Sequence, residues 1–187
     1  MLIEHQGKRP RVDPSAHVAP TATLVGDVRI GADTVVSHGT VITAEGGPAT
    51  LGGACVVMEN AVLRGTRHHP LSVGDNVLIG PHAMLVGCTV EDSCFVATGA
   101  AVFNGAVLEH ASQVRIHGVV HIKTRLAAGA FVPIGWVAVG DPAKILPPDR
   151  HDEIWEEQAR LDFPGTVFGV DAEHLSLIHI SEPTRPY

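Results

Sequence analysis

Aliphatic side chains recur at every sixth position through most of this sequence, with two interruptions and one shift of register. A small or β-branched residue stands four positions after nearly every one of them. Because alternate side chains of a strand point to the same side, a short strand and a tight turn fit within six residues. A period of six does not match the 3.6 residues of an α-helical turn, so the pattern predicts a series of short strands. The repeated aliphatic positions are Val18, Leu24, Ile30, Val36, Ile42, Leu51, Val57, Leu63, Val73, Ile79, Leu85, Val90, Val96, Val102 and Leu108, with weaker copies at Val114, Val120, Leu126 and Val132.

The six-residue repeat predicts an all-β solenoid, a left-handed parallel β-helix of hexapeptide repeats. Three hexapeptides form the three faces of one triangular coil, and stacked coils bury an interior that a single coil cannot bury alone. Aromatic residues make up only 4% of the chain, which suits a narrow interior filled by small aliphatic side chains. We expect the β-helix domain to cover residues 1–146.

Two segments interrupt the repeat, and both are expected to leave the prism at its corners as loops. Residues 43–50 read TAEGGPAT, and residues 64–72 read RGTRHHPLS. Loops carried by a rigid scaffold are common places for binding and catalytic residues. The second segment is of particular interest because it contains two adjacent histidines.

The region after the repeats, residues 147–174, is expected to hold a C-terminal helix and a tail. Two prolines end the strand character, and residues 150–162 have the pattern of an amphipathic helix that packs back along the prism. Asp149 is the expected cap of this helix. The expected packing residues are Ile154, Trp155 and Leu161.

The last segment, residues 175–187, reads LSLIHISEPTRPY. This string looks like the translation of a sequencing-library adapter, and we interpret it as an artefact rather than as evolved protein.

Charge and composition exclude several classes of function. The net charge of −7 and the pI near 5.9 are unfavourable for binding nucleic acid, which needs a basic face. An apolar run long enough to cross a membrane is missing, and the first residues lack the apolar core of a secretory signal. Three cysteines, an odd number, indicate reduced thiols. We therefore expect a cytoplasmic protein with no nucleic-acid or membrane partner.

The segment from Leu71 to Ala106 reads LSVGDNVLIGPHAMLVGCTVEDSCFVATGAAVFNGA. It resembles the central signature of the γ-class carbonic anhydrases, which are homotrimeric left-handed β-helices, and the match extends over about residues 12–162. A later GDPAK segment, residues 140–144, is shared with acyltransferases of the same fold and does not distinguish the two groups. The resemblance implies a homotrimer.

The resemblance also implies a divalent metal held at subunit interfaces by three histidines, and this sequence departs from that pattern. The residues at the three ligand positions are Arg64, Pro81 and Val86. An arginine stays protonated, and proline and valine offer no side-chain donor atom. A catalytic zinc needs three protein ligands and an open position for water. The expected metal site is therefore degenerate, and no cofactor is expected.

Residues that support the metal in the family are altered as well. Met58 and Glu59 stand in place of a Gln-Asp pair, and Thr43 stands in place of an arginine. Arg64 at a subunit interface could pair with Glu59 or bind a small anionic ligand, because a guanidinium group suits carboxylate and phosphate. The candidate catalytic residues are Glu59, Arg64 and His68.

One interpretation of the other histidines is a rearranged metal site. His69 and His82 are the candidate ligands, with His38 or His117 of a neighbouring subunit, and zinc or iron is expected only if such a site exists. The alternative interpretation is that these are surface or loop histidines with no bound metal, because a one-residue step usually turns a side chain to another face.

Three functions are compatible with these observations. The first is a trimeric binding or scaffold protein related to γ-carbonic anhydrase, in which the fold persists without the site. The second is an acyltransferase that uses a coenzyme A thioester, with His68 or His69 as the base. The third is an active carbonic anhydrase with a rearranged metal site.

Overall fold

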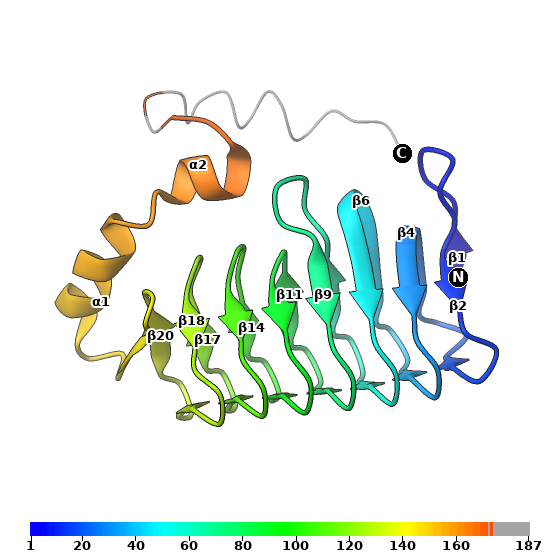
Figure 1. The fold of residues 1–187 in the computed structure, drawn as a ribbon, viewed down its shortest axis with the longest axis horizontal. Helices are drawn as coiled ribbons and strands as arrows, with labels where there is room; N and C mark the ends of the chain where they lie inside the picture. The colour runs from blue at the N-terminus through cyan, green and yellow to red at the C-terminus, as the bar shows by residue number, and fades with distance from the viewer. Residues whose placement is uncertain (172, 174–187) are drawn as a thin grey trace.

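Strands that lie one coil apart pair in parallel, as the repeat predicts (Figure 1). The computed structural model describes residues 1–171 and Glu173, and residues 175–187, interpreted above as adapter-derived, lie outside the described residues. His17 pairs with Val35, 18 positions later, which is three hexapeptides and therefore one full coil. About eight such turns stack into a parallel β-solenoid, and the predicted fold is confirmed.

The strands form three faces, named here by their order along each coil. The first face contains β1 (Leu2–Ile3), β8 (Val62–Arg64), β11 (Met84–Val86), β14 (Ala101–Val102), β17 (Val119–Val120), β20 (Val137–Val139) and the antiparallel β21 (Lys144–Leu146). The second face contains β2 (Arg11–Val12), β9 (Leu71–Val73), β12 (Thr89–Val90), β15 (Val107–Leu108) and β18 (Arg125–Leu126). The third face contains β3 (His17–Val18), β5 (Val35–Val36), β7 (Val56–Val57), β10 (Leu78–Ile79), β13 (Phe95–Val96), β16 (Gln113–Val114) and β19 (Phe131–Val132). Two long strands, β4 (Thr23–Ile30) and β6 (Val41–Leu51), turn the corner from the first face to the second and join those faces into one sheet.

The predicted interior positions form the core. Every repeated aliphatic residue is buried except Val18, which is half-buried in the first coil, where no earlier coil covers it. The small positions four residues later are buried too, except the half-buried Ala130. Two threonines among them have their hydroxyls hydrogen-bonded within the stack. Thr34 Oγ1 donates to the carbonyl of Gly52 at 2.8 Å, and Thr40 Oγ1 donates to that of Met58 at 3.0 Å. The interior is thus apolar, and its few hydroxyls are hydrogen-bonded.

The two insertions behave differently. All of residues 43–50 belong to β6, which pairs with β4 on both sides of a register shift, so the loop predicted there is wrong. The extra residues are accommodated inside a long strand that turns the corner. The second insertion does leave the prism, as the loop 65–70 between β8 and β9. This loop sits at the corner between the first and second faces.

The C-terminal region holds two helices rather than one. The first, α1 (His151–Ala159), contains the buried Ile154 and contacts β20, so it packs on the last coil instead of running back along the prism. Its N-cap is Arg150, without a side-chain cap, so the predicted capping by Asp149 is wrong. Trp155 is 57% exposed, because it follows Ile154 directly and points to another side of the helix.

A second helix, α2 (Phe163–Phe168), was not predicted. Asp162 caps it by accepting a hydrogen bond from the Gly165 N–H at 3.2 Å. Figure 1 shows α2 folded back from α1 toward the upper edge of the prism, where the loop 65–70 lies. A chain reversal after α1 therefore brings the C-terminal segment against the second insertion.

Candidate functional site

Three positions singled out by the family resemblance lie side by side on the first face. Arg64 pairs in register with Thr43 on one side and with Val86 on the other, so the three residues occupy the same place in successive coils. Neighbouring strands are about 4.8 Å apart. Arg64 is exposed and Val86 is half-buried. Two of the three expected ligand positions are therefore adjacent in the fold.

The third position lies at the far end of the same strand segment. Pro81 is at the corner between the third and first faces, and Val86 is five residues further along the chain. An extended segment of this length spans about 16 Å at roughly 3.3 Å per residue. A single ion cannot touch both positions within one chain. Any site that uses both must be built between two copies of the chain.

Glu59 and His82 share the corner that carries Pro81. The His82 N–H donates to the Glu59 carbonyl at 3.0 Å across adjacent coils, and His82 has a positive φ of 57° that makes the turn. Both side chains are exposed. Glu59 lies at the corner before the first face and Arg64 at the end of β8, so the width of one face separates them.

The two candidate metal ligands are at different corners. His82 is at the corner between the third and first faces, whereas His69 is in the loop 65–70 between the first and second faces. Within the part of the chain that the structure describes, no three His, Cys, Asp or Glu side chains gather as a metal site would require. The structure does not bring His69 and His82 together.

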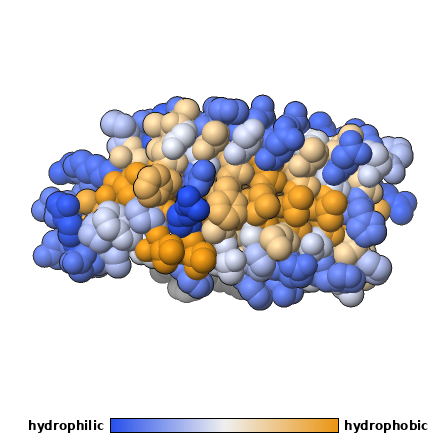
Figure 2. Space-filling view, turned by 90° about the horizontal axis from the view of Figure 1, so that it is seen from below, coloured by the Kyte–Doolittle hydropathy of each residue, from blue (hydrophilic) through white to orange (hydrophobic). Residues whose placement is uncertain are grey.

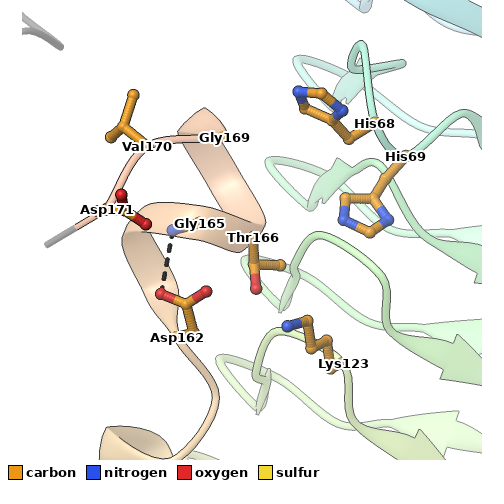
Figure 3. A pocket seen from close by; sticks show the side chains of 9 residues that line it. All are labelled: His68, His69, Lys123, Asp162, Gly165, Thr166, Gly169, Val170 and Asp171. Atoms are coloured by element: carbon orange, nitrogen blue, oxygen red, sulfur yellow. Dashed lines mark hydrogen bonds between the residues drawn. The ribbon is translucent and has the colours of Figure 1, made fainter.

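A pocket of about 450 Å³ lies between the loop 65–70 and the C-terminal segment (Figure 3). The loop contributes two histidines, the corner after β17 contributes a lysine, and the segment around α2 forms the opposite wall. The lining residues are His68, His69, Lys123, Asp162, Gly165, Thr166, Gly169, Val170 and Asp171. The sequence analysis identified the two histidines as candidates but did not place them in a pocket.

A buried amide holds the histidine loop in place. Asn104 is 2% exposed, and its Nδ2 donates to Thr66 Oγ1 at 3.2 Å. The Thr66 hydroxyl in turn donates to the His69 carbonyl at 3.0 Å, and the Thr66 N–H donates to the same carbonyl at 2.9 Å. These bonds close a tight turn over residues 66–69. The His69 ring is consequently fixed relative to the coil below it.

The environment of His69 favours its neutral form. Burial lowers the pKa of His69, and the charges of His68 and Lys123 lower it further, while a hydrogen bond with the Thr166 backbone acts in the opposite direction. Because the pKa lies below its ordinary value near 6.5, the ring is uncharged at neutral pH. A neutral imidazole can accept a proton or donate a hydrogen bond in this pocket.

The pocket is closed by contacts between the loop and the C-terminal segment. Lys123 Nζ donates to the Leu161 carbonyl at 3.4 Å. Gly169 ends α2 with a φ of +69°, and a Cβ built there would lie 2.9 Å from His68 Nε2, so the His68 ring packs directly against this glycine. Lys123, Asp162 and Asp171 were missed by sequence reasoning: Lys123 reaches the loop by the stacking of coils at one corner, and the two aspartates reach it by the chain reversal after α1.

The three cysteines are structural. All are free and buried, and Cys55 and Cys94 fill the small interior position of the repeat. Burial raises the pKa of Cys88 to about 12, so this thiol stays protonated and is a poor nucleophile.

The outer surfaces of the three faces differ in polarity. Outward side chains of the third face form an apolar row, and Figure 2 shows this row in orange along the prism. On the second face the corresponding positions are polar over most coils, beginning with Arg11, Arg29, Thr50, Ser72 and Thr89. The apolar row contains Val35, Val56, Leu78 and Phe95, with Phe131 two coils further on. Among the described residues, no helix is long and apolar enough to cross a membrane.

No protein-family model matches the chain. Over 153 residues it is 35% identical to γ carbonic anhydrase 1, a mitochondrial protein of Arabidopsis thaliana, with 79% of this chain and 54% of that protein aligned. A hexapeptide transferase family protein from Anaplasma phagocytophilum superposes with a TM-score of 0.56 at 27% identity, covering 86% of this chain and 91% of that one. A UDP-N-acetylglucosamine acyltransferase from Bacteroides fragilis shares the fold, with a TM-score of 0.60 at 14% identity over 95% of this chain and 91% of that one. The chain spans about half the length of the curated relatives it matches first.

Proposed function

The chain is a γ-class carbonic-anhydrase-like protein of the hexapeptide-repeat superfamily, and we propose that it is a homotrimeric binding or scaffold protein without the family's metal-dependent hydration of CO2. Fold and active site are separable, so the β-helix can persist after the site is lost. Three buried free cysteines fit a reducing compartment, which supports a cytoplasmic location.

The observation that carries this proposal is the set of side chains at the three ligand positions. Arg64 and Val86 are adjacent in register, where two histidines of one subunit would stand, and Pro81 is where the partner's ligand would come from. None of these side chains offers a lone pair to a metal ion. These residues do not fit a divalent metal.

The trimer is supported by the apolar row of the third face. Val35, Val56 and Leu78 are each 37% exposed, which is unusual for aliphatic side chains aligned on one surface of an isolated chain. Val62, on the adjoining first face, is 41% exposed. A second copy of the chain that packs on these outward apolar side chains would remove them from water, and the family resemblance makes the closed assembly a trimer.

Restoring the ligands tests the metal assignment. In the variant that combines Arg64→His, Pro81→His and Val86→His, we expect a zinc site to return at about one ion per chain, because three imidazoles suffice for a catalytic-type site. The unaltered protein should take up none under the same conditions. If the restored protein is trimeric but binds no zinc, these positions are not the ligand positions. Equal zinc binding by the unaltered protein would show that a working site exists.

Charge placed in the apolar row tests the trimer. The double variant Val56→Glu and Leu78→Glu should sediment as a single chain, because it would bury unpaired carboxylates in the interface. The matched variant Ser72→Glu and Thr89→Glu, on the polar second face, should keep the mass of three 19.7 kDa chains. A monomeric unaltered protein would contradict the proposal directly.

The pocket beside the loop 65–70 favours one alternative, an acyltransferase that uses a coenzyme A thioester. His69 is held in place and neutral, as a general base must be, and His68 is next to it. A ligand that binds only the native state raises the apparent melting temperature. An increase with acetyl-CoA that is lost in His69→Ala, but kept in His82→Ala, would support this alternative. The absence of any increase at high concentration would exclude it.

A further inference from the structure

We propose that the pocket between the loop 65–70 and the α2 segment binds a small zwitterion, a molecule with a carboxylate at one end and an ammonium group at the other. This site is independent of the ligand positions at Arg64, Pro81 and Val86. It needs neither a metal ion nor a second copy of the chain, because one chain supplies both of its walls.

One wall of the pocket supplies hydrogen-bond donors and positive charge. It consists of His68 and His69 from the loop 65–70 and Lys123 from the corner after β17 (Figure 3). Among the described residues, Lys123 Nζ makes one long hydrogen bond of 3.4 Å, to the Leu161 carbonyl, and an ammonium group has three donors. Two of its donors therefore remain for a ligand. A carboxylate is the natural acceptor for a lysine flanked by imidazole N–H groups.

The opposite wall supplies negative charge. Asp162 and Asp171 lie at the two ends of the α2 segment, and Figure 3 shows both on the side of the pocket away from the histidines. One oxygen of Asp162 accepts the Gly165 N–H, which leaves its second oxygen for another donor. An ammonium group suits such a pair of carboxylates.

Side chains of opposite charge line the same pocket but do not pair. Within residues 1–171 and Glu173, no ion pair involves Lys123, Asp162 or Asp171. A molecule with a single charge would satisfy one wall and would be repelled or left unpaired at the other. A molecule with both charges satisfies both walls at once, and the volume of about 450 Å³ lies within the usual range for small-molecule sites.

The donor wall is preorganised for this role. The bond from the buried Asn104 to Thr66 fixes the turn that carries both histidines. The His69 ring also rests on the coil below, since a Cβ at Gly105 would lie 3.2 Å from His69 Cε1. A site whose donors are fixed before binding loses less conformational entropy when the ligand arrives.

Three matched probes test the proposal: 5-aminopentanoate, which carries both charges, pentanoate, which carries only the carboxylate, and pentylamine, which carries only the ammonium group. Binding to the full chain is measured by ligand-observed saturation-transfer NMR at pH 7.5, with untagged protein. We expect saturable binding of 5-aminopentanoate that is at least about tenfold tighter than that of either single-charge probe.

Variants assign the binding to the two walls. Lys123→Met and Asp171→Asn should each reduce the affinity for 5-aminopentanoate to that of a single-charge probe. The matched variants Lys8→Met and Asp33→Asn, at exposed positions in the first coils, should leave it unchanged. All four changes are at the surface, and far-ultraviolet circular dichroism checks that each variant is folded.

Several results would overturn the proposal. One is the absence of saturable binding of 5-aminopentanoate up to ~20 mM, since a weaker site has no recognisable affinity. Pentanoate or pentylamine binding as tightly as 5-aminopentanoate would show that only one wall is used. Unchanged binding in Lys123→Met and Asp171→Asn would place the ligand elsewhere. None of these results bears on zinc uptake by the histidine-restored variant, so the two proposals fail separately.

Discussion

The hydrogen bond between Asn104 and Thr66 should be worth a measurable part of the stability of the protein and should set the environment of His69. Asn104 is 2% exposed and its Nδ2 lies 3.2 Å from Thr66 Oγ1. The net contribution of one intramolecular hydrogen bond to the free energy of unfolding is about 0.5–1.5 kcal/mol. Asn104→Ala should therefore lower the free energy of unfolding by about 1–2 kcal/mol, because the loss of packed side-chain atoms adds to the lost bond.

A double-mutant cycle isolates the bond from the packing. Asn104→Ala and Thr66→Val are made separately and together, and each protein is unfolded in urea at one fixed chain concentration, because oligomers unfold in a concentration-dependent way. The two changes should be non-additive by about 0.5–1.5 kcal/mol, the range for residues in direct contact. Thr66→Val keeps the branched shape of the side chain and replaces its hydroxyl with a methyl group.

The same variants should alter the titration of His69. Burial is the main cause of its lowered pKa, so release of the loop 65–70 should raise the pKa of His69 toward 6.5. Imidazole proton resonances recorded over a pH series report this value directly. Additive effects on stability within about 0.3 kcal/mol, together with an unchanged His69 titration, would refute the argument that Asn104 positions the loop.

Three further predictions follow from the core, from a buried histidine and from the pocket. Leu63 is fully buried between Ile42 and Leu85 of the adjacent coils, so Leu63→Ala should lower the free energy of unfolding in urea by about 2–5 kcal/mol. Burial lowers the pKa of His121, whose Nδ1 has no hydrogen-bond partner among the described residues. The folded protein therefore binds a proton at His121 less readily than the unfolded chain does, so the free energy of unfolding is unaffected by this group above about pH 6.5 and falls as the pH is lowered further. His121→Phe should therefore reduce the loss of melting temperature between pH 7.5 and pH 5, and an unchanged loss would contradict this. Gly169→Ala should cost about 1–2 kcal/mol for the positive φ and should also weaken binding of 5-aminopentanoate, because its Cβ would displace His68.

The β-helix could be predicted almost completely from the sequence, because its physics is local and repeated. One aliphatic residue in six specifies one buried side chain per strand, and residues such as Leu63 and Val96 are buried where the pattern put them. The insertion at residues 43–50 could not be placed, since a longer segment can either leave the prism or extend a strand around a corner. The register shift in β6 shows that the second solution was adopted.

The candidate site could be predicted only in part. The sequence indicated His68 and His69 as candidates, and their loop does leave the prism and lines a pocket. The wall around α2 could not be foreseen, because Asp171 is about 100 positions from this loop along the chain and reaches it only through the reversal after α1. Trp155 shows a related limit: a short amphipathic pattern gives the buried side of a helix only approximately, and here Ile154 alone is buried on α1.

The most direct test of the proposed function is the metal content of the unaltered protein. Untagged protein is purified without chelator, incubated with excess zinc, passed through a desalting column and analysed by elemental mass spectrometry. If Arg64, Pro81 and Val86 stand where the ligands would be, zinc, iron and cobalt should each be far below one ion per chain, because no three His, Cys, Asp or Glu side chains of the described residues gather into a ligand set. About one ion of any of these metals per chain would contradict the account and would show that the protein retains or has rebuilt a metal centre.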